Sequence, residues 1–259
     1  MGTAPGSDPG PASFQRRAYH RELEELRHDL IRLAAQVTEL VPRGTEVLLN
    51  GDLTGAQGLI DDDDLIDRMS VEIEERIYSV LVRQAPMASE LRELVTMLKS
   101  VAELERSADL VINVAKAARR MYGAPLSAKV RGLIAAMSAE AQKLMRLAVD
   151  AFAERDDALA AALADIDDRL DQLNRDMVEA IFETKASAEL DLQMAVQLAL
   201  IARYYERIGD HAVNIGQRVA YMVTGWLPEH TGALRADARD ARATSAGPLG
   251  ATLTEEAHG

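Results

Sequence analysis

Acidic side chains recur in this sequence as pairs that lie four residues apart. The pairs are Asp63/Asp67 and Glu105/Asp109 in the first half of the chain, and Asp167/Asp171 and Glu206/Asp210 in the second half. A spacing of four residues places both members of a pair on the same face of an α-helix, where two carboxylates repel each other. Carboxylate oxygens are ligands that suit Mg, Ca, Mn and Fe. Bound cations are therefore one explanation of the spacing.

A helical projection turns these pairs inward. At about 100° per residue, Glu105 and Asp109 fall inside or at the edge of the apolar arc of their helix. Glu103 projects to the far side, as a solvent-facing charge should. Glu206 and Asp210 are likewise flanked by small and apolar residues. Carboxylates on a half-buried face are costly unless they are paired or bound to metal, so the projection favours metal binding.

Other interpretations of the acids stay open. Charge runs on helices are usually solvated faces, and this applies most to the four aspartates at 61–64. Arg106 and Arg207, each next to an acid of a pair, could neutralise the carboxylates without metal. His211 projects about 100° away from Asp210, so we interpret it as a structural or partner-facing residue.

The last helix of the pattern has two further features. Gly209 and Gly216 each lower helix propensity by about 1 kcal/mol relative to alanine. Close helix packing is the favoured explanation, and room for a metal cluster beside Asp210 is an additional one. An apolar stripe from Tyr204 to Met222 lies opposite the acids. This helix therefore either contacts a second body or is packed all round by its own domain.

The periodicity predicts six helices, and no segment alternates long enough to be a strand. The helices are expected at about 17–49, 53–83, 86–122, 126–153, 156–184 and 188–224. Residues 1–16 and 226–259 are rich in Gly, Pro and small residues and are predicted to be disordered. The fold class is therefore all-α.

An internal repeat divides the helical region into two halves. LERSADLVINV (104–114) aligns with YERIGDHAVNI (205–215) at an offset of 101 residues, and DDDDLID (61–67) aligns with DIDDRLD (165–171) at an offset of 104 residues. Two copies of one ancestral unit explain both offsets. The prediction is two tandem antiparallel three-helix bundles, 17–123 and 124–225.

Composition excludes several classes of protein. The 259 residues are 48% hydrophobic and 4% aromatic, and the net charge of −13 argues against direct nucleic-acid binding. The sequence contains no cysteine, so disulfides, thiol catalysis and cysteine-ligated zinc are excluded. No apolar run approaches the roughly 20 residues that span a bilayer, and the N-terminus lacks the apolar core of a signal peptide. These absences indicate a cytoplasmic protein.

The motifs ERIGDHAVNI, QAPMASELR and the duplicated DD-x-x-D element resemble the PhoU family of phosphate-uptake regulators. The resemblance runs from about Tyr19 to Gly225. The second copy of the motif is highly specific. The first copy departs from it, because ERSAD replaces the expected ERIGD.

The resemblance implies a fold of two three-helix bundles related by pseudo-twofold symmetry. It also implies a cofactor of divalent or trivalent metal ions, often as iron clusters, with Mn, Mg or Zn as alternatives. It implies that the eight paired acids are the ligands, and that Asn113, Asn214, Arg106 and Arg207 orient them. It further implies a cytoplasmic negative regulator of the phosphate-starvation response, which is not an enzyme. Such a protein would be peripheral to membrane complexes and link the ATPase of a phosphate ABC transporter to a sensor histidine kinase. The two-sided last helix makes a homodimer the expected assembly.

Two competing functions remain. A carboxylate-bridged oxidase needs paired Glu-x-x-His motifs, and the sequence has only Glu25/His28 and Glu255/His258, so this alternative is weak. A metal-free helical adaptor is the stronger rival, since regulation can work by protein contact alone.

Overall fold

The computed structural model describes residues 11–186 and 191–226. Within these ranges all regular structure is α-helical, which confirms the predicted fold class. The helices are α1 (Pro11–Asn50), α2 (Leu53–Asp61), α3 (Asp63–Gln84), α4 (Ser89–Arg120), α5 (Ala128–Glu154), α6 (Asp157–Ala186) and α7 (Leu192–Thr224). Most of the segments predicted to be disordered, residues 1–10 and 227–259, lie outside the described residues.

The predicted second helix, 53–83, is in fact two helices that meet at Asp62. The backbone N–H of Asp62 donates to the carbonyl of Gly58 and closes α2, and α3 begins at the next residue. The break falls within the run of four aspartates, where like charges one turn apart destabilise a continuous helix. Three other helices begin at residues that differ from the prediction: α1 at Pro11, α4 at Ser89 and α7 at Leu192. At the start of α7 the carboxylate of Asp191 accepts a hydrogen bond from the N–H of Gln193.

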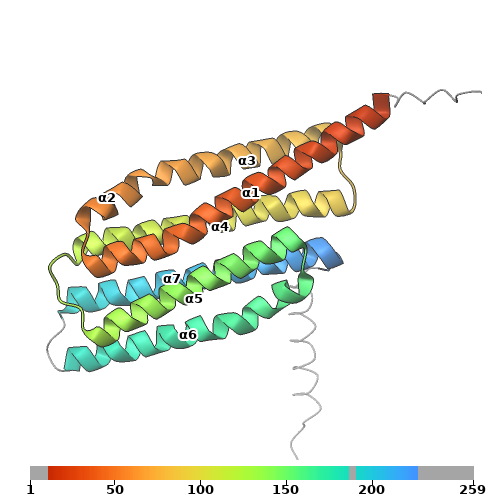
Figure 1. Cartoon of the computed structure of the whole chain (residues 1–259). Coiled ribbons are helices and arrows are strands. Elements are labelled where there is room, and N and C mark those ends of the chain that lie inside the picture. The colour runs from red at the N-terminus through yellow and green to blue at the C-terminus, as the bar shows by residue number, and fades with distance from the viewer. Residues whose placement is uncertain (1–10, 187–190, 227–259) are drawn as a thin grey trace, which may run out of the picture. The chain divides into compact units, whose positions relative to one another are not determined.

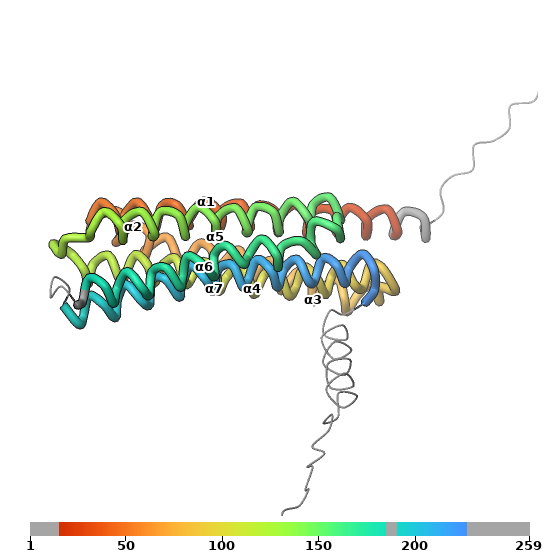
Figure 2. The backbone as a smooth tube through the Cα atoms, turned by 90° about the horizontal axis from the view of Figure 1, so that it is seen from below, coloured from red at the N-terminus to blue at the C-terminus, as the bar shows by residue number. Residues whose placement is uncertain are grey.

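The helices form one compact unit of two layers, which ends at Gly225. In one layer α3, α4, α7 and α6 lie side by side in that order, and α1 and α5 pack against each other as the second layer. Figure 2 shows α1 and α5 above the other long helices, and Figure 1 shows α1 to α4 in one half and α5 to α7 in the other. Of the helices described, none is long and apolar enough to cross a membrane. The predicted boundary between bundles at residue 124 stays a prediction.

The core runs continuously through both halves because α4 and α7 lie in the middle. Helix α7 packs against α4, α5 and α6, which explains its second apolar stripe: Ile208, Ile215 and Met222 are buried within the chain itself. Tyr205 is fully buried, and its hydroxyl lies 2.7 Å from Thr45 Oγ1, which in turn lies 2.6 Å from Ser138 Oγ. These hydroxyls join α1, α5 and α7 inside the apolar core.

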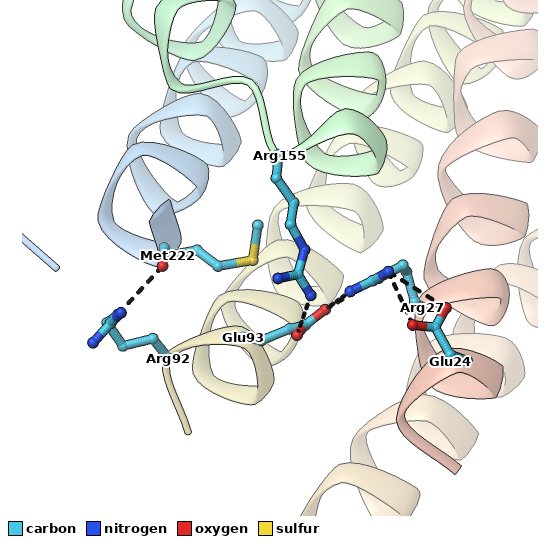
Figure 3. A network of polar contacts seen from close by, with 6 residues as sticks. All are labelled: Glu24, Arg27, Arg92, Glu93, Arg155 and Met222. Atoms are coloured by element: carbon cyan, nitrogen blue, oxygen red, sulfur yellow. Dashed lines mark hydrogen bonds and ion pairs between the residues drawn. The ribbon is translucent and has the colours of Figure 1, made fainter. Parts of the chain in front are cut away.

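A buried carboxylate joins the two halves at one end of the unit. Glu93 of α4 is 3% exposed and accepts hydrogen bonds from Arg27 of α1 (Nε–Oε1 3.1 Å) and from Arg155 (Nη2–Oε2 2.7 Å). Figure 3 shows Glu93 between the two arginines. Arg155 follows α5 in a left-handed conformation (φ 55°), and Arg92 donates to the carbonyl of Met222 near the end of α7 (3.3 Å). Charged contacts therefore fix α1, α4, α7 and the α5–α6 turn to one another.

Candidate metal centre

In the first half the four predicted ligands form one electrostatic cluster between α3 and α4. Asp63 and Glu105 are half-buried, and Asp67 and Asp109 are exposed. Burial, followed by the charges of Asp67 and Asp109, raises the pKa of Asp63. Burial, followed by the charges of Asp109 and Asp67, raises the pKa of Glu105. The structure therefore brings these four carboxylates close enough to repel one another.

The second half repeats this arrangement between α6 and α7. Asp167, Asp171 and Asp210 are half-buried, and Glu206 is 9% exposed. Burial, then the charges of Asp171 and Asp210, raises the pKa of Asp167 to about 6. The Oδ1 atom of Asp167 is buried and has no hydrogen-bond partner. An unpaired buried carboxylate oxygen is costly, and it is the kind of atom that a cation would satisfy.

Gly209 makes room for this carboxylate. A Cβ atom at Gly209 would lie 2.4 Å from Asp167 Oδ1 and 2.7 Å from Leu170 Cδ2. Both distances are shorter than the van der Waals contacts that Cβ atoms make in proteins. At Gly216 a Cβ would lie 2.5 Å from Leu163 Cδ1 and 2.9 Å from the Ala160 carbonyl oxygen. Both glycines therefore permit close packing of α7 against α6, and this was the favoured explanation for glycine at these positions.

The acids lie on the side of their layer that α1 and α5 leave uncovered. The residues of α3 and α6 that form ion pairs with the covering helices are Arg76 and Arg83, which bind α1, and Glu183, which binds Lys129 of α5. At about 100° per residue, Asp67 projects about 160–180° away from Arg76 and Arg83, and Asp167 projects about 160° away from Glu183. Both carboxylate clusters therefore face the same open side.

Glu103 was predicted to face solvent, and this prediction is wrong. Its side chain is 15% exposed, and Oε2 lies 2.5 Å from Nδ1 of the buried His211 on α7. Burial raises the pKa of Glu103, but the hydrogen bond and charge of His211, together with the charge of Arg106 and the hydrogen bond of Asn214, lower the pKa overall. Helix α4 packs against α7 as well as against α1 and α3, so a projection with a single buried face assigned Glu103 to the wrong side.

Of the four residues expected to orient the ligands, two contact Glu103. Asn214 donates to Glu103 Oε2 (3.4 Å), and Arg106 donates to Glu103 Oε1 (2.7 Å), so both contact Glu103 rather than a predicted ligand. Asn113 is half-buried and Arg207 is exposed. Sequence reasoning missed Arg203, which forms an ion pair with Glu206 one turn later. The spacing of three residues was the signal that could have identified it.

The donor set fits a hard cation by its chemistry. Across the part of the chain that the structure describes, Arg203 is the only basic residue in an ion pair with any of the eight acids. The raised pKa values and the unpaired Asp167 oxygen show that negative charge in each cluster is poorly compensated. The side chains do not converge as they stand: among the described residues, no group of three Asp, Glu or His side chains is arranged to hold an ion. Binding would therefore require rotation of side chains on the open face.

Comparisons with known proteins agree with this architecture. The sequence matches the PhoU domain twice, over residues 30–118 and 134–219. It is 34% identical over 214 residues to the phosphate-specific transport system accessory protein PhoU homolog 1 of Mycobacterium tuberculosis, covering 82% of this chain and 96% of that protein. It is 31% identical over 207 residues to the homolog 1 of Thermotoga maritima, covering 80% of this chain and 89% of that protein.

Solved structures show the same fold. The crystal structure of PhoU from Pseudomonas aeruginosa superposes with a TM-score of 0.76 at 30% identity and covers 80% of this chain and all of that chain. The phosphate transport system regulatory protein PhoU from Streptococcus pneumoniae superposes with a TM-score of 0.75, covering 81% of this chain and 98% of that chain, and at 24% identity it supports the fold alone. The curated relatives are named as accessory proteins, which agrees with the prediction that the chain is not an enzyme. The two matched segments, the duplicated acids and the shared architecture lead to one conclusion: the chain belongs to the PhoU family and consists of two PhoU domains.

Proposed function

We propose that this chain is a cytoplasmic accessory protein that negatively regulates a phosphate-specific transport system and the response to phosphate starvation. The names of its relatives supply the phosphate-transport role. The domains act by binding metal ions and by contacting partner proteins. The observation that carries the metal part is the unpaired, buried Oδ1 atom of Asp167 within a cluster of mutually repelling carboxylates.

Each domain supplies its own ligands. The first would hold cations through Asp63, Asp67, Glu105 and Asp109, and the second through Asp167, Asp171, Glu206 and Asp210. A divalent or trivalent ion, whether iron, Mn, Mg or Zn, would neutralise the carboxylates. It would also tie α3 to α4 and α6 to α7, since each set of ligands is shared between two helices.

The partners we propose are the ATPase of a phosphate ABC transporter and a sensor histidine kinase, contacted at the membrane periphery, together with a second copy of the chain. The net charge of −13 favours partner surfaces that are basic, because complementary charge accelerates association and excludes wrong partners. Capture of both partners by the full-length chain from a lysate, and light scattering for the dimer, test this directly. Binding to neither partner would remove the linking role.

Metal analysis of protein purified without chelator tests the metal part. The wild-type chain should carry bound metal, and the double variant Glu206→Ala plus Asp210→Ala should lose the metal of the second domain only. Its thermal midpoint should then respond less to chelator than that of the wild type, because bound metal stabilises only the folded state. Negligible metal in the wild type, with no change in melting when chelator is added, would support the second candidate.

That second candidate is a metal-free helical adaptor. It is favoured by the observation that, in the described part of the chain, the acids do not converge on a common point. An adaptor would bind the same partners with equal affinity before and after chelation. Partner binding that depends on metal would exclude it.

A further inference from the structure

The two domains differ beside their carboxylate clusters. In the first domain an open pocket of about 350 Å³ lies between α3 and α4, next to two of the predicted ligands; we call it the first-domain pocket. Its lining consists of Asp67, Ser70, Val71, Glu74, Val101, Ala102 and Glu105. The lining contains three carboxylates and no basic side chain.

Ser70 provides a second, independent sign of a ligand in this pocket. Its side chain is only 5% exposed, and its hydroxyl has no hydrogen-bond partner. Most buried hydroxyls in proteins are hydrogen-bonded, so one that lines an acidic pocket without a partner calls for an explanation. A hydroxyl oxygen, like a carboxylate oxygen, is a suitable ligand for a hard cation or for one of its bound waters.

The second domain has a different set of residues at the matching positions. With the offsets of 104 for α3 to α6 and 101 for α4 to α7, the lining becomes Asp171, Asn174, Arg175, Val178, Ala202, Arg203 and Glu206. Glu74 is replaced by Val178, and Ala102 is replaced by Arg203. The formal charge of the lining changes from −3, for three acids, to 0, for two acids and two arginines. Arg203 forms an ion pair with Glu206, which is the residue that matches Glu105 of the first-domain pocket.

We propose that the first-domain pocket binds an additional divalent cation that the second domain does not bind, because Arg203 supplies the positive charge there. This inference rests on the proposed metal binding and adds a specific inequality between the two domains. The ligands are the carboxylates of Asp67, Glu74 and Glu105 and the hydroxyl of Ser70. These groups surround the pocket rather than converge on one point, so part of the coordination is through water, as is usual for Mg²⁺.

Counting bound Mn²⁺ by electron paramagnetic resonance, which reports the free aqueous ion, tests this proposal on the full chain. Ala102→Arg, which copies the second domain, should lose one bound ion per chain relative to the wild type. Glu74→Gln, which keeps the shape of the side chain, should lose the same ion. The matched control is Glu75→Gln, because Glu75 is exposed, follows Glu74 in the sequence and does not line the pocket. This variant should bind as many Mn²⁺ ions per chain as the wild type.

The reverse exchange gives the second domain three acids at the matching positions and, because Arg175 remains, a formal charge of −2. Arg203→Ala combined with Val178→Glu should gain one bound Mn²⁺ per chain. Circular dichroism of each variant checks that the helices are retained, and Glu74→Gln keeps the test decisive if the bulkier Ala102→Arg variant does not fold.

The outcomes separate the two proposals. If the wild type binds Mn²⁺ but Ala102→Arg and Glu74→Gln bind as many ions, the inequality between domains is wrong while metal binding stands. Equal losses in Glu74→Gln and Glu75→Gln would also overturn it, because they would indicate diffuse attraction to surface charge. A wild type that binds no Mn²⁺ overturns both.

Discussion

At Asp167, three observations concern the same carboxyl group. It is half-buried, it lies beside the charges of Asp171 and Asp210, and its Oδ1 atom has no hydrogen-bond partner. Burial and like charge both favour the protonated form, which explains why the pKa rises from 3.8 to about 6. The group is therefore a source of instability in metal-free protein near neutral pH.

The sign of the pH dependence follows from the raised pKa. Well below pH 3.8 the carboxyl is protonated in both states and costs nothing. As pH rises through about 4 to about 6 the unfolded chain ionises before the folded chain does, so folded stability falls. In chelator at pH 7.5, Asp167→Asn should raise the free energy of unfolding by about 1–2 kcal/mol, a value reduced to allow for partial exposure. Urea unfolding at pH 7.5 and pH 4 measures this. A gain of the same size at pH 4 would show that the charge is not the cause.

Individual residues also show which features could be predicted from the sequence and which could not. The positions and spacing of the eight acids were readable from the sequence, because helix periodicity is local. The pairing of Glu103 with His211, and that of Glu93 with Arg27 and Arg155, was not readable. Those partners lie on different helices, so no periodicity within one helix records the contact.

At the scale of the elements, six predicted helices correspond to the seven described, and the difference is the break at Asp62. The repeat identified which helices are equivalent, and Gly, Pro and capping residues indicated most of their ends. The layer order α3–α4–α7–α6 could not be predicted, since it depends on which apolar faces meet across the repeat. The two apolar stripes on α7 were compatible with a central helix or with a contact to a second body, and they did not identify the neighbours of the helix.

Close packing of α7 on α6 is tested by adding a single methyl group. Gly209→Ala gains about 1 kcal/mol of helix propensity. Its Cβ would nevertheless collide with Asp167 Oδ1 and Leu170 Cδ2 at 2.4 and 2.7 Å. We expect a net loss of about 1–2 kcal/mol in the free energy of unfolding, measured with urea.

The matched control is Gly132→Ala in α5. A Cβ at Gly132 meets no heavy atom within 4 Å, so this variant should gain about 0.5–1 kcal/mol from propensity alone. Equal effects at the two positions would mean that packing against α6 is not what requires Gly209.

At the scale of the whole helical unit, the two halves share an extensive interface in addition to the contacts within each half. Helix α4 packs on α7 and α1 packs on α5, and Glu93 and Thr45 add polar contacts between the halves. The two domains are therefore expected to unfold together in one cooperative transition, although sequence repetition alone would suggest independent bundles.

Glu93→Ala tests the charged contact between halves. It leaves the guanidinium groups of Arg27 and Arg155 without their shared carboxylate, and we expect a loss of about 2–3 kcal/mol in the free energy of unfolding. Glu24→Ala removes an exposed partner of the same Arg27 and should cost less than about 1 kcal/mol. Urea denaturation followed by circular dichroism gives both values. Comparable losses in the free energy of unfolding would show that the buried ion pairs of Glu93 stabilise the fold no more than the exposed pair of Glu24 does.

The one-sided cover that α1 and α5 provide has a consequence for how occupancy is communicated. Neighbouring helix axes lie 8–10 Å apart, so the outer helices of a four-helix layer are separated by only about 25–30 Å. Both acidic clusters face the same uncovered side of that layer. A single globular protein of ordinary size that rests on this side spans both clusters at once. Such a protein would respond to the combined ion load of the two repeats as one output, rather than to either repeat by itself.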